Sequence, residues 1–193
     1  MNRDGIAEEA ARLVCEELLT DYRAAKLKAL QRLRLPPRTP LPDNARVHEA
    51  VLSYLQLFGG EEYQQRLQLM RVQAPRWMKR FASFEPRLSG SVVSGAVTAA
   101  THLQLHLFAD QAEAVDVFLL ERGIDFEQAE RRYRYPDGRE RMLPVAQLDG
   151  GDFGVDLVIF PFDELPRPPL SPLDGAPCAR LTLAEAEKLA ANA

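Results

Sequence analysis

Cysteine, histidine and tryptophan are scarce in this chain, and long apolar runs are absent. The 193 residues include two cysteines, three histidines and one tryptophan. Cys15 and Cys178 lie too far apart for a zinc motif or a disulfide framework, so we expect buried, reduced thiols and no metal site. No apolar run reaches transmembrane length, and Met1–Ile6 lacks the apolar core of a secretory signal. These absences predict a cytoplasmic protein without a membrane partner.

Two common catalytic motifs are also missing. The chain contains no GxxxxGK[ST] phosphate loop, which argues against ATPase or ligase chemistry of that type. Ser89-Gly90-Ser91 has no glycine two residues after Ser91, so it does not form the Gly-x-Ser-x-Gly elbow of serine hydrolases. The net charge of −4 argues against attraction of the whole molecule to nucleic acid, although local basic patches remain compatible with it.

The N-terminal half predicts about three helices. Apolar residues at three- and four-residue steps indicate one long amphipathic helix from Ile6 to Leu33, acidic in its first half and basic in its second, as the helix dipole favours. A proline-rich linker over residues 35–42 precedes a helix that Asp43 or Asn44 caps and that runs to Phe58. A third helix is expected over residues 61–81, with Pro75 kinking or splitting it.

The C-terminal half alternates strands and helices. We expect two strands within residues 87–108, a helix over 110–122, a hairpin over 125–148 around Pro136-Asp137-Gly138, and a strand over 154–160 whose apolar character indicates a central position. A capping box at Thr182 opens a last helix. The helix over 110–122 is predicted to bury Ala114, Val115, Phe118 and Leu119. The fold class is therefore α+β: a helical region over residues 1–83 and a mixed sheet with flanking helices over 84–193.

One motif organises the expected function. Gly90-Ser91 forms a small-residue turn after the first strand, Gly95 follows, and Thr101-His102-Leu103-Gln104-Leu105 opens the next strand. Small residues at such a turn let backbone N–H groups approach a phosphate closely. This spacing resembles the polymerase-β-type nucleotidyltransferase superfamily, especially its minimal members. The resemblance implies a nucleotidyltransferase-like core in which Gly90, Ser91 and Gly95 hold the triphosphate of a nucleotide.

The chain departs from that family at the metal-binding residues. The family has an Asp-x-Asp pair on the second strand and a third carboxylate on a later strand, and together these bind two divalent metals. Here His102 and Gln104 replace the pair, and Asp156 is the candidate for the third position. Mg²⁺ prefers hard oxygen ligands, and one carboxylate cannot hold two such ions. We therefore expect a former metal site at His102, Gln104 and Asp156, without ordinary nucleotidyl transfer and with no cofactor.

Two features of these strands allow a second interpretation. Asp156 is costly to bury unless it is paired or borders a site, but it can also lie at a strand end facing solvent. His102, Gln104 and His106 share one face of a strand, so with a carboxylate they could bind a transition metal. A polar row on the solvent face of the sheet is the simpler interpretation of these three residues, and we favour it.

The hairpin is the second candidate binding surface. Arginines alternate with tyrosines along it, and such ribbons can hold phosphates and stack bases. The arginines considered for nucleic-acid contact are Arg132, Arg134, Arg139 and Arg141. An exposed arm kept soluble by its charge is an equally natural interpretation. The basic stretches of the helices and this hairpin could also dock an acidic protein partner.

Three functions remain open from the sequence. The first is a nucleotidyltransferase-fold protein that binds nucleotide or RNA in a regulatory or scaffolding role without two-metal catalysis. The second is an active transferase with a rearranged Mg²⁺ site that uses Asp156, with Asp110 or His106 as a further ligand. The third is a protein-interaction module with no nucleotide ligand. The first is the one we expect, because the spacing of the motif is kept while its carboxylates are lost.

Overall fold

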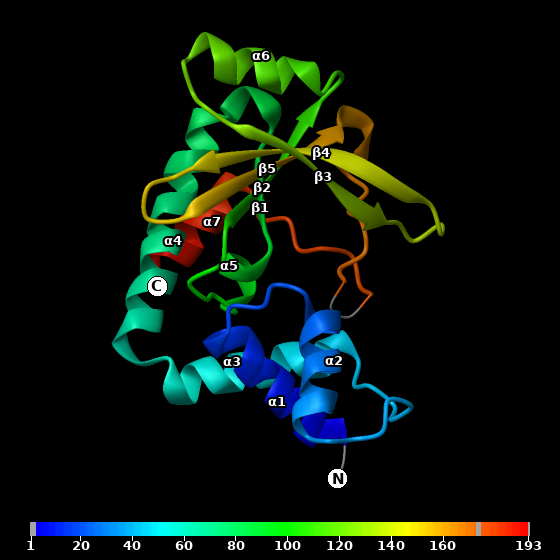
Figure 1. The fold of residues 1–193 in the computed structure, drawn as a ribbon. Coiled ribbons are helices and arrows are strands. Elements are labelled where there is room, and N and C mark those ends of the chain that lie inside the picture. Colours follow the sequence, from blue (N-terminus) through cyan, green and yellow to red (C-terminus); the bar gives the residue numbers. More distant parts are fainter. Residues whose placement is uncertain (1–2, 173–174, 193) are drawn as a thin grey trace. The chain divides into compact units, whose positions relative to one another are not determined.

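The computed structural model describes residues 3–172 and 175–192, which form two compact units (Figure 1). The helical unit comprises residues 3–66, 95–101, 172 and 175, and the sheet unit comprises residues 67–94, 102–171 and 176–192. The boundary predicted after residue 83 falls inside the sheet unit. Of the helices described, none combines the length and the apolar character that a bilayer-spanning segment requires.

The prediction of one long helix over residues 6–33 is wrong, because two helices form there. α1 (Arg3–Glu16) and α2 (Tyr22–Arg32) are separated by a turn in which Leu18 has a φ of +56°. Asp21 caps α2, since its side chain accepts a hydrogen bond from a backbone N–H of the first turn. The apolar stripe continues through this cap signal, which is why periodicity alone predicted one helix.

The charges of these two helices pair with each other. Glu17, just after α1, contacts Lys28 and Arg32 of α2, and the Glu17–Arg32 pair has an N–O distance of 2.6 Å. Arg32 also lies 3.6 Å from Glu9 on α1. The acidic first half and the basic second half of this segment therefore face each other across a helical hairpin. The helix dipole, which we took as the reason for their order, is not needed to explain it.

Two further helices complete the N-terminal region. α3 (Asn44–Phe58) begins at the N-cap residue Asp43, as predicted. α4 (Gly60–Arg80) continues through Pro75 and is not split there, and it contributes residues to both units. Four helices therefore precede the sheet where about three were expected. The two cysteines are free and half-buried.

The sheet unit contains one five-stranded mixed sheet in the order β1-β2-β5-β4-β3. β2 and β5 are parallel neighbours, and the other three pairings are antiparallel. The α+β class with a mixed sheet is thereby confirmed, with β5 at its centre. The strands are β1 (Arg87–Ser89), β2 (Leu103–Ala109), β3 (Glu127–Arg134), β4 (Glu140–Asp149) and β5 (Gly154–Pro161). The helices of this region are α5 (Ser91–Ser94), α6 (Glu113–Glu121) and α7 (Leu183–Ala191), with 3-10 turns at Ala82–Phe84 and Phe162–Glu164.

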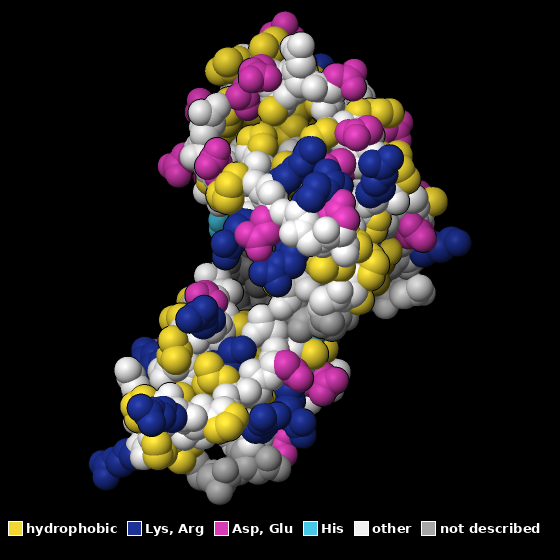
Figure 2. All heavy atoms as spheres, turned by 90° about the vertical axis from the view of Figure 1, so that its right-hand side faces the viewer, with side chains coloured by type: hydrophobic (Ala, Val, Ile, Leu, Met, Phe, Trp, Pro, Cys, Tyr) yellow, Lys and Arg dark blue, Asp and Glu magenta, His cyan; other side chains and the backbone are white. Residues whose placement is uncertain are grey.

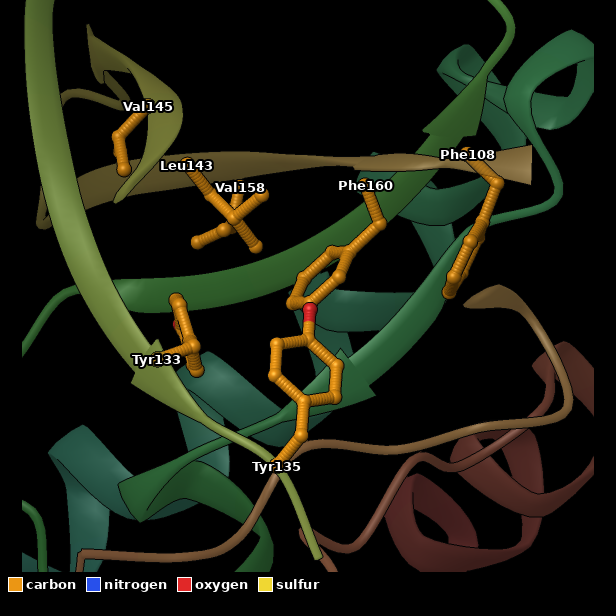
Figure 3. Close-up of a cluster of buried hydrophobic side chains, with 7 residues drawn as sticks. All are labelled: Phe108, Tyr133, Tyr135, Leu143, Val145, Val158 and Phe160. Atoms are coloured by element: carbon orange, nitrogen blue, oxygen red, sulfur yellow. The ribbon is translucent and has the colours of Figure 1, made fainter. Parts of the chain in front are cut away.

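The sheet is buried on both faces. Leu103, Leu105 and Leu107 of β2 are fully buried on one face. The other face carries a cluster to which β2, β3, β4 and β5 contribute (Figure 3). The members of this aromatic cluster are Phe108, Tyr133, Tyr135, Leu143, Val145, Val158 and Phe160. Both tyrosines of the Arg-Tyr hairpin are therefore packed in the core.

Local signals in the second half of the chain are mostly confirmed. The hairpin turns at residues 136–138, where Gly138 has a φ of +82°, and the capping box of Thr182 and Glu185 opens α7. Gly123 follows α6 with a φ of +62°, as expected of a residue that ends a helix. The burial predicted for Val115 and Leu119 of α6 is confirmed, but Ala114 is exposed and Phe118 is only half-buried.

Candidate functional site

A row of polar side chains crosses one face of the sheet. Ser89 of β1 pairs in register with Gln104 of β2, which pairs with Asp156 of β5, which in turn pairs with Gln147 of β4. Residues that pair in register lie on the same face of a sheet, so these four side chains form one continuous row. We call this row, with the side chains that bond to it, the polar cleft, a name for these residues and not for a cavity.

Asp156 is the centre of the polar cleft, and donors occupy both of its carboxylate oxygens. Arg131 Nη2 donates to Oδ2 at 2.6 Å, while His102 Nδ1 lies 2.8 Å from Oδ1. Gln147 Nε2 donates to Oδ1 at 3.2 Å. The Asp156 side chain is 7% exposed. The interpretation of Asp156 as a strand-end residue facing solvent is therefore wrong.

The environment of Asp156 keeps it ionised. Burial alone would raise the pKa of this carboxyl group, but the hydrogen bonds from His102 and Arg131 and the charge of Arg131 together lower the pKa below its usual range. The carboxylate is thus a fixed negative charge that a guanidinium neutralises. Loss of the Asp156 carboxylate would leave the Arg131 guanidinium without its counter-ion.

Arg131 also connects Asp156 to the second strand. Its Nη1 donates to Gln104 Oε1 at 3.0 Å, so one guanidinium group bridges position 104 of β2 and position 156 of β5. The Gln104 amide nitrogen in turn donates to Tyr133 Oη at 3.1 Å and lies 2.8 Å from His106 Nε2. Gln104 is therefore held in place on both sides of its amide group.

His106 is fully buried, which contradicts the favoured interpretation of residues 102, 104 and 106 as a row facing solvent. Arg180 Nε donates to His106 Nδ1 at 3.1 Å, and the imidazole packs on Phe160 with ring centroids 4.5 Å apart. Burial lowers the pKa of His106 well below its usual value, and the charges of Arg180 and Arg131 lower it further. His106 is therefore neutral and belongs to the core.

His102 differs from the buried histidine in its exposure. Its side chain is 44% exposed, and it stands just before β2, with its ring over Gly154. A Cβ at position 154 would lie 2.6 Å from the ring atoms of His102, so glycine leaves the space that the ring fills. This contact and the bond to Asp156 fix the orientation of the imidazole at the edge of the polar cleft.

The Gly90 turn lies beside the polar cleft. Gly90 has a φ of +79°, and a Cβ there would lie 3.3 Å from Gln104 Cβ and Oε1. Ser91, which begins α5, follows directly. Gly95 belongs to the helical unit, where its carbonyl accepts a hydrogen bond from Tyr63 Oη. The predicted phosphate-binding residues Gly90 and Ser91 thus adjoin Gln104, whereas Gly95 lies in the other unit.

The donor set of the polar cleft does not fit Mg²⁺. Position 102 presents a nitrogen, the carbonyl oxygen of Gln104 accepts from Arg131, and both oxygens of Asp156 are engaged. Within residues 3–172 and 175–192 no cluster of three histidine, cysteine or acidic side chains could hold a metal ion. Asp110 follows β2 at its far end, six residues after Gln104, which is about 20 Å along a strand. It cannot share a metal with Asp156.

The remaining arginines of the hairpin are paired with acidic side chains. Arg132 and Arg134 both contact Glu140, Arg139 contacts Asp137, and Arg141 lies 3.1 Å from Glu164. Figure 2 shows basic and acidic side chains interspersed on the face of the sheet unit that it presents. With the tyrosines buried and these arginines paired, the hairpin lacks the aromatic surface on which bases could stack.

The predicted site residues did not include Ser89, Arg131, Tyr133 and Gln147 of the polar cleft, nor Arg180, which bonds to His106. A signal existed for Arg131, because strand alternation places it on the same face as Tyr133 and Tyr135, inward, and opposite Arg132 and Arg134. No local signal points to Arg180, which reaches His106 from 74 positions away along the chain.

Comparisons with protein-family models, curated proteins and solved structures find no match for this chain.

Proposed function

We propose that this protein is a nucleotidyltransferase-fold protein that binds a nucleotide in its polar cleft without two-metal catalysis. Such a protein serves a regulatory or scaffolding role. One observation carries the proposal: the guanidinium group of Arg131 bridges Gln104 and Asp156, which are two of the three positions where the family that the motif resembles has metal-binding carboxylates. A fixed cation of the chain stands where that family places exchangeable divalent ions.

The adjacency of the three predicted elements supports this proposal. Gln104 and Asp156 pair in register on parallel neighbouring strands, and the Gly90 turn contacts Gln104. The backbone N–H groups of Ser91 and Val92 have no hydrogen-bond acceptor among the described residues. Donors aimed at phosphate oxygens are what an anion cradle requires, and Gly90 lets the backbone come close to them.

The chemistry of Arg131 suits a phosphate ligand. A guanidinium carries five N–H donors in a planar fork, of which two are used here on Asp156 and Gln104. The side chain is 37% exposed, so a ligand can reach it. Binding that relies on an arginine and on backbone donors needs no divalent ion, which separates this proposal from that of an active transferase with a rearranged metal site.

The ligand favoured here is a single nucleotide and not RNA. An RNA strand requires a basic track with stacking platforms along several nucleotides. On the hairpin the tyrosines are buried, so they offer no such platform. A mononucleotide needs only the cleft itself. Binding of an RNA strand along the hairpin is therefore treated as an alternative outcome of the titration described below.

Calorimetric titration of ATP, GTP, CTP and UTP tests the proposal. We expect at least one of them to bind with a Kd that changes less than about threefold between excess EDTA and millimolar Mg²⁺, because Arg131 supplies the positive charge. Arg131→Ala should weaken that binding about tenfold or more, equivalent to about 1.4 kcal/mol.

Arg132→Ala is the matched control, since Arg132 is the next residue and points to the opposite face of β3. It should leave the affinity unchanged. Absence of binding by all four nucleotides removes the proposal. Binding that appears only with Mg²⁺ or Mn²⁺, together with transfer of labelled nucleotide, would favour the active transferase, and binding of an oligoribonucleotide that Arg132→Ala weakens would favour RNA.

A further inference from the structure

A cavity of about 290 Å³ lies between the C-terminal half of α4 and the loop that joins β4 to β5. Gln73, Arg76, Trp77 and Arg80 line it from α4, at positions that share one face of a helix. The loop over residues 150–153 lines it from the other side. It shares no residue with the polar cleft, so what it binds is independent of the function proposed above.

The two arginines of this cavity lack acidic partners. Neither Arg76 nor Arg80 forms an ion pair with any residue in the described parts of the chain, whereas all the arginines of the hairpin are paired. They stand four residues apart, a spacing at which like charges repel on a helix. Asp152 is the one acidic residue of the lining, so these side chains together carry a net charge of about +1.

Trp77 forms the apolar wall of the cavity. The Arg80 guanidinium lies over the indole, 4.6 Å from the ring centroid, and Phe81 stacks on it at 6.5 Å. The indole Nε1–H has no acceptor among the residues that the structure describes. Gly150 keeps the loop close to the indole, because a Cβ there would lie 2.5 Å from the Phe153 carbonyl oxygen and 3.4 Å from Trp77 Cζ2.

We propose that this cavity binds a phosphate monoester. Arg76 and Arg80 offer two guanidinium forks, Gln73 offers an amide and Trp77 offers an indole N–H, all of them donors suited to phosphate oxygens. The charge of a monoester, about −1.5 to −2 at neutral pH, exceeds that of a carboxylate and matches two arginines. The volume admits the phosphate with part of the group that carries it. The monoester belongs either to a free nucleoside monophosphate or to the 5′ end of a nucleic acid.

Trp77 provides a direct readout, because it is the only tryptophan in the chain. Its indole N–H gives a single ¹H–¹⁵N NMR signal, which a phosphate bound in this cavity should shift. The full-length protein is titrated with adenosine 5′-monophosphate, with a 5′-phosphorylated tetrauridylate and with the same oligomer bearing a 5′-hydroxyl group. We expect a saturable shift with the first, the second or both, and none with the 5′-hydroxyl oligomer.

The variant Arg76→Gln should weaken this binding about tenfold. Lys79→Gln is the matched control: it removes the same charge from the same helix, but Lys79 pairs with Glu187 of α7. Its affinity should stay within about twofold of the unmodified protein. Arg131→Ala, which alters the polar cleft, should leave the Trp77 shift intact.

The pattern of results separates this proposal from the previous one. A shift with adenosine 5′-monophosphate alone identifies a free nucleotide as the source of the phosphate, and a shift with the 5′-phosphorylated oligomer alone identifies a nucleic-acid end. A shift that disappears in Arg131→Ala but survives in Arg76→Gln assigns the ligand to the polar cleft and overturns the cavity site. The proposal is equally overturned if neither phosphorylated compound shifts the signal, or if the 5′-hydroxyl oligomer shifts it equally.

Discussion

Replacing Asp156 with alanine should lower the free energy of unfolding by about 3 kcal/mol, the largest effect of any single substitution in the polar cleft. The carboxylate is buried and accepts hydrogen bonds from Arg131, His102 and Gln147. Its removal leaves the guanidinium without a counter-ion in a partly buried place. The partial exposure of Arg131 keeps the estimate near the low end of the range for buried ion pairs.

Urea denaturation of four variants, Asp156→Ala, Arg131→Ala, their combination and Asp152→Ala, checks this expectation. Asp152→Ala is the control for Asp156→Ala, because Asp152 is an exposed carboxylate four residues earlier, and it should change stability by less than about 0.5 kcal/mol. The double variant Asp156→Ala with Arg131→Ala should be less destabilised than the sum of the two single variants, since it contains no orphaned cation. Additive losses would show that the two residues do not act as a pair.

Acidification should destabilise the protein well above the pH at which carboxylates titrate. Because the folded-state pKa of His106 lies below its unfolded value of about 6.5, the unfolded state binds the extra proton as the pH falls. The stability that neutral His106 contributes is therefore complete above about pH 6.5 and is lost below it. Between pH 6.5 and pH 5 the free energy of unfolding should therefore fall, by no more than about 1.4 kcal/mol per pH unit for this single group.

The charged and titratable groups that face His106 keep the ring neutral. Arg180 approaches from the segment before α7, Arg131 and Tyr133 lie on β3, and no acidic side chain is among the causes of the pKa shift. Stability curves from pH 7 to pH 5 should be flatter in His106→Gln than in the unmodified protein. If His106→Gln does not fold, ¹⁵N shifts of the ring in the unmodified protein at pH 5.5 decide, because a protonated His106 contradicts the expectation.

Much of the fold follows from local patterns in the sequence. The hairpin at residues 136–138, the N-cap at Asp43, the capping box at Thr182 and the central position of β5 each depend on a short signal with one dominant physical cause. The break at Asp21 was missed because a cap signal can lie inside an apolar stripe that continues in the next helix. Periodicity reports which face is buried, and it does not report where the chain turns back.

The polar cleft was only half predictable. The spacing of Gly90, His102 and Gln104 along the chain placed these residues correctly beside one another, and Asp156 joins them through parallel pairing of β2 with β5. Strand alternation sets Arg131 apart from Arg132 and Arg134, but five arginines lie between residues 131 and 141, and alternation alone does not say which of them meets Asp156. Only the register and curvature of the hairpin select Arg131 for Asp156.

Binding of Mn²⁺, followed by electron paramagnetic resonance, tests most directly whether Arg131 stands in for a metal. We expect no site of submillimolar affinity in the unmodified protein. The variant that combines His102→Asp, Gln104→Asp and Arg131→Ala presents three carboxylates, one just before β2, one on β2 and one on β5, without the guanidinium. It should bind Mn²⁺ with a Kd below about 0.1 mM. Tight Mn²⁺ binding by the unmodified protein that Asp156→Ala abolishes would contradict the assignment of Arg131 to the place of the metal.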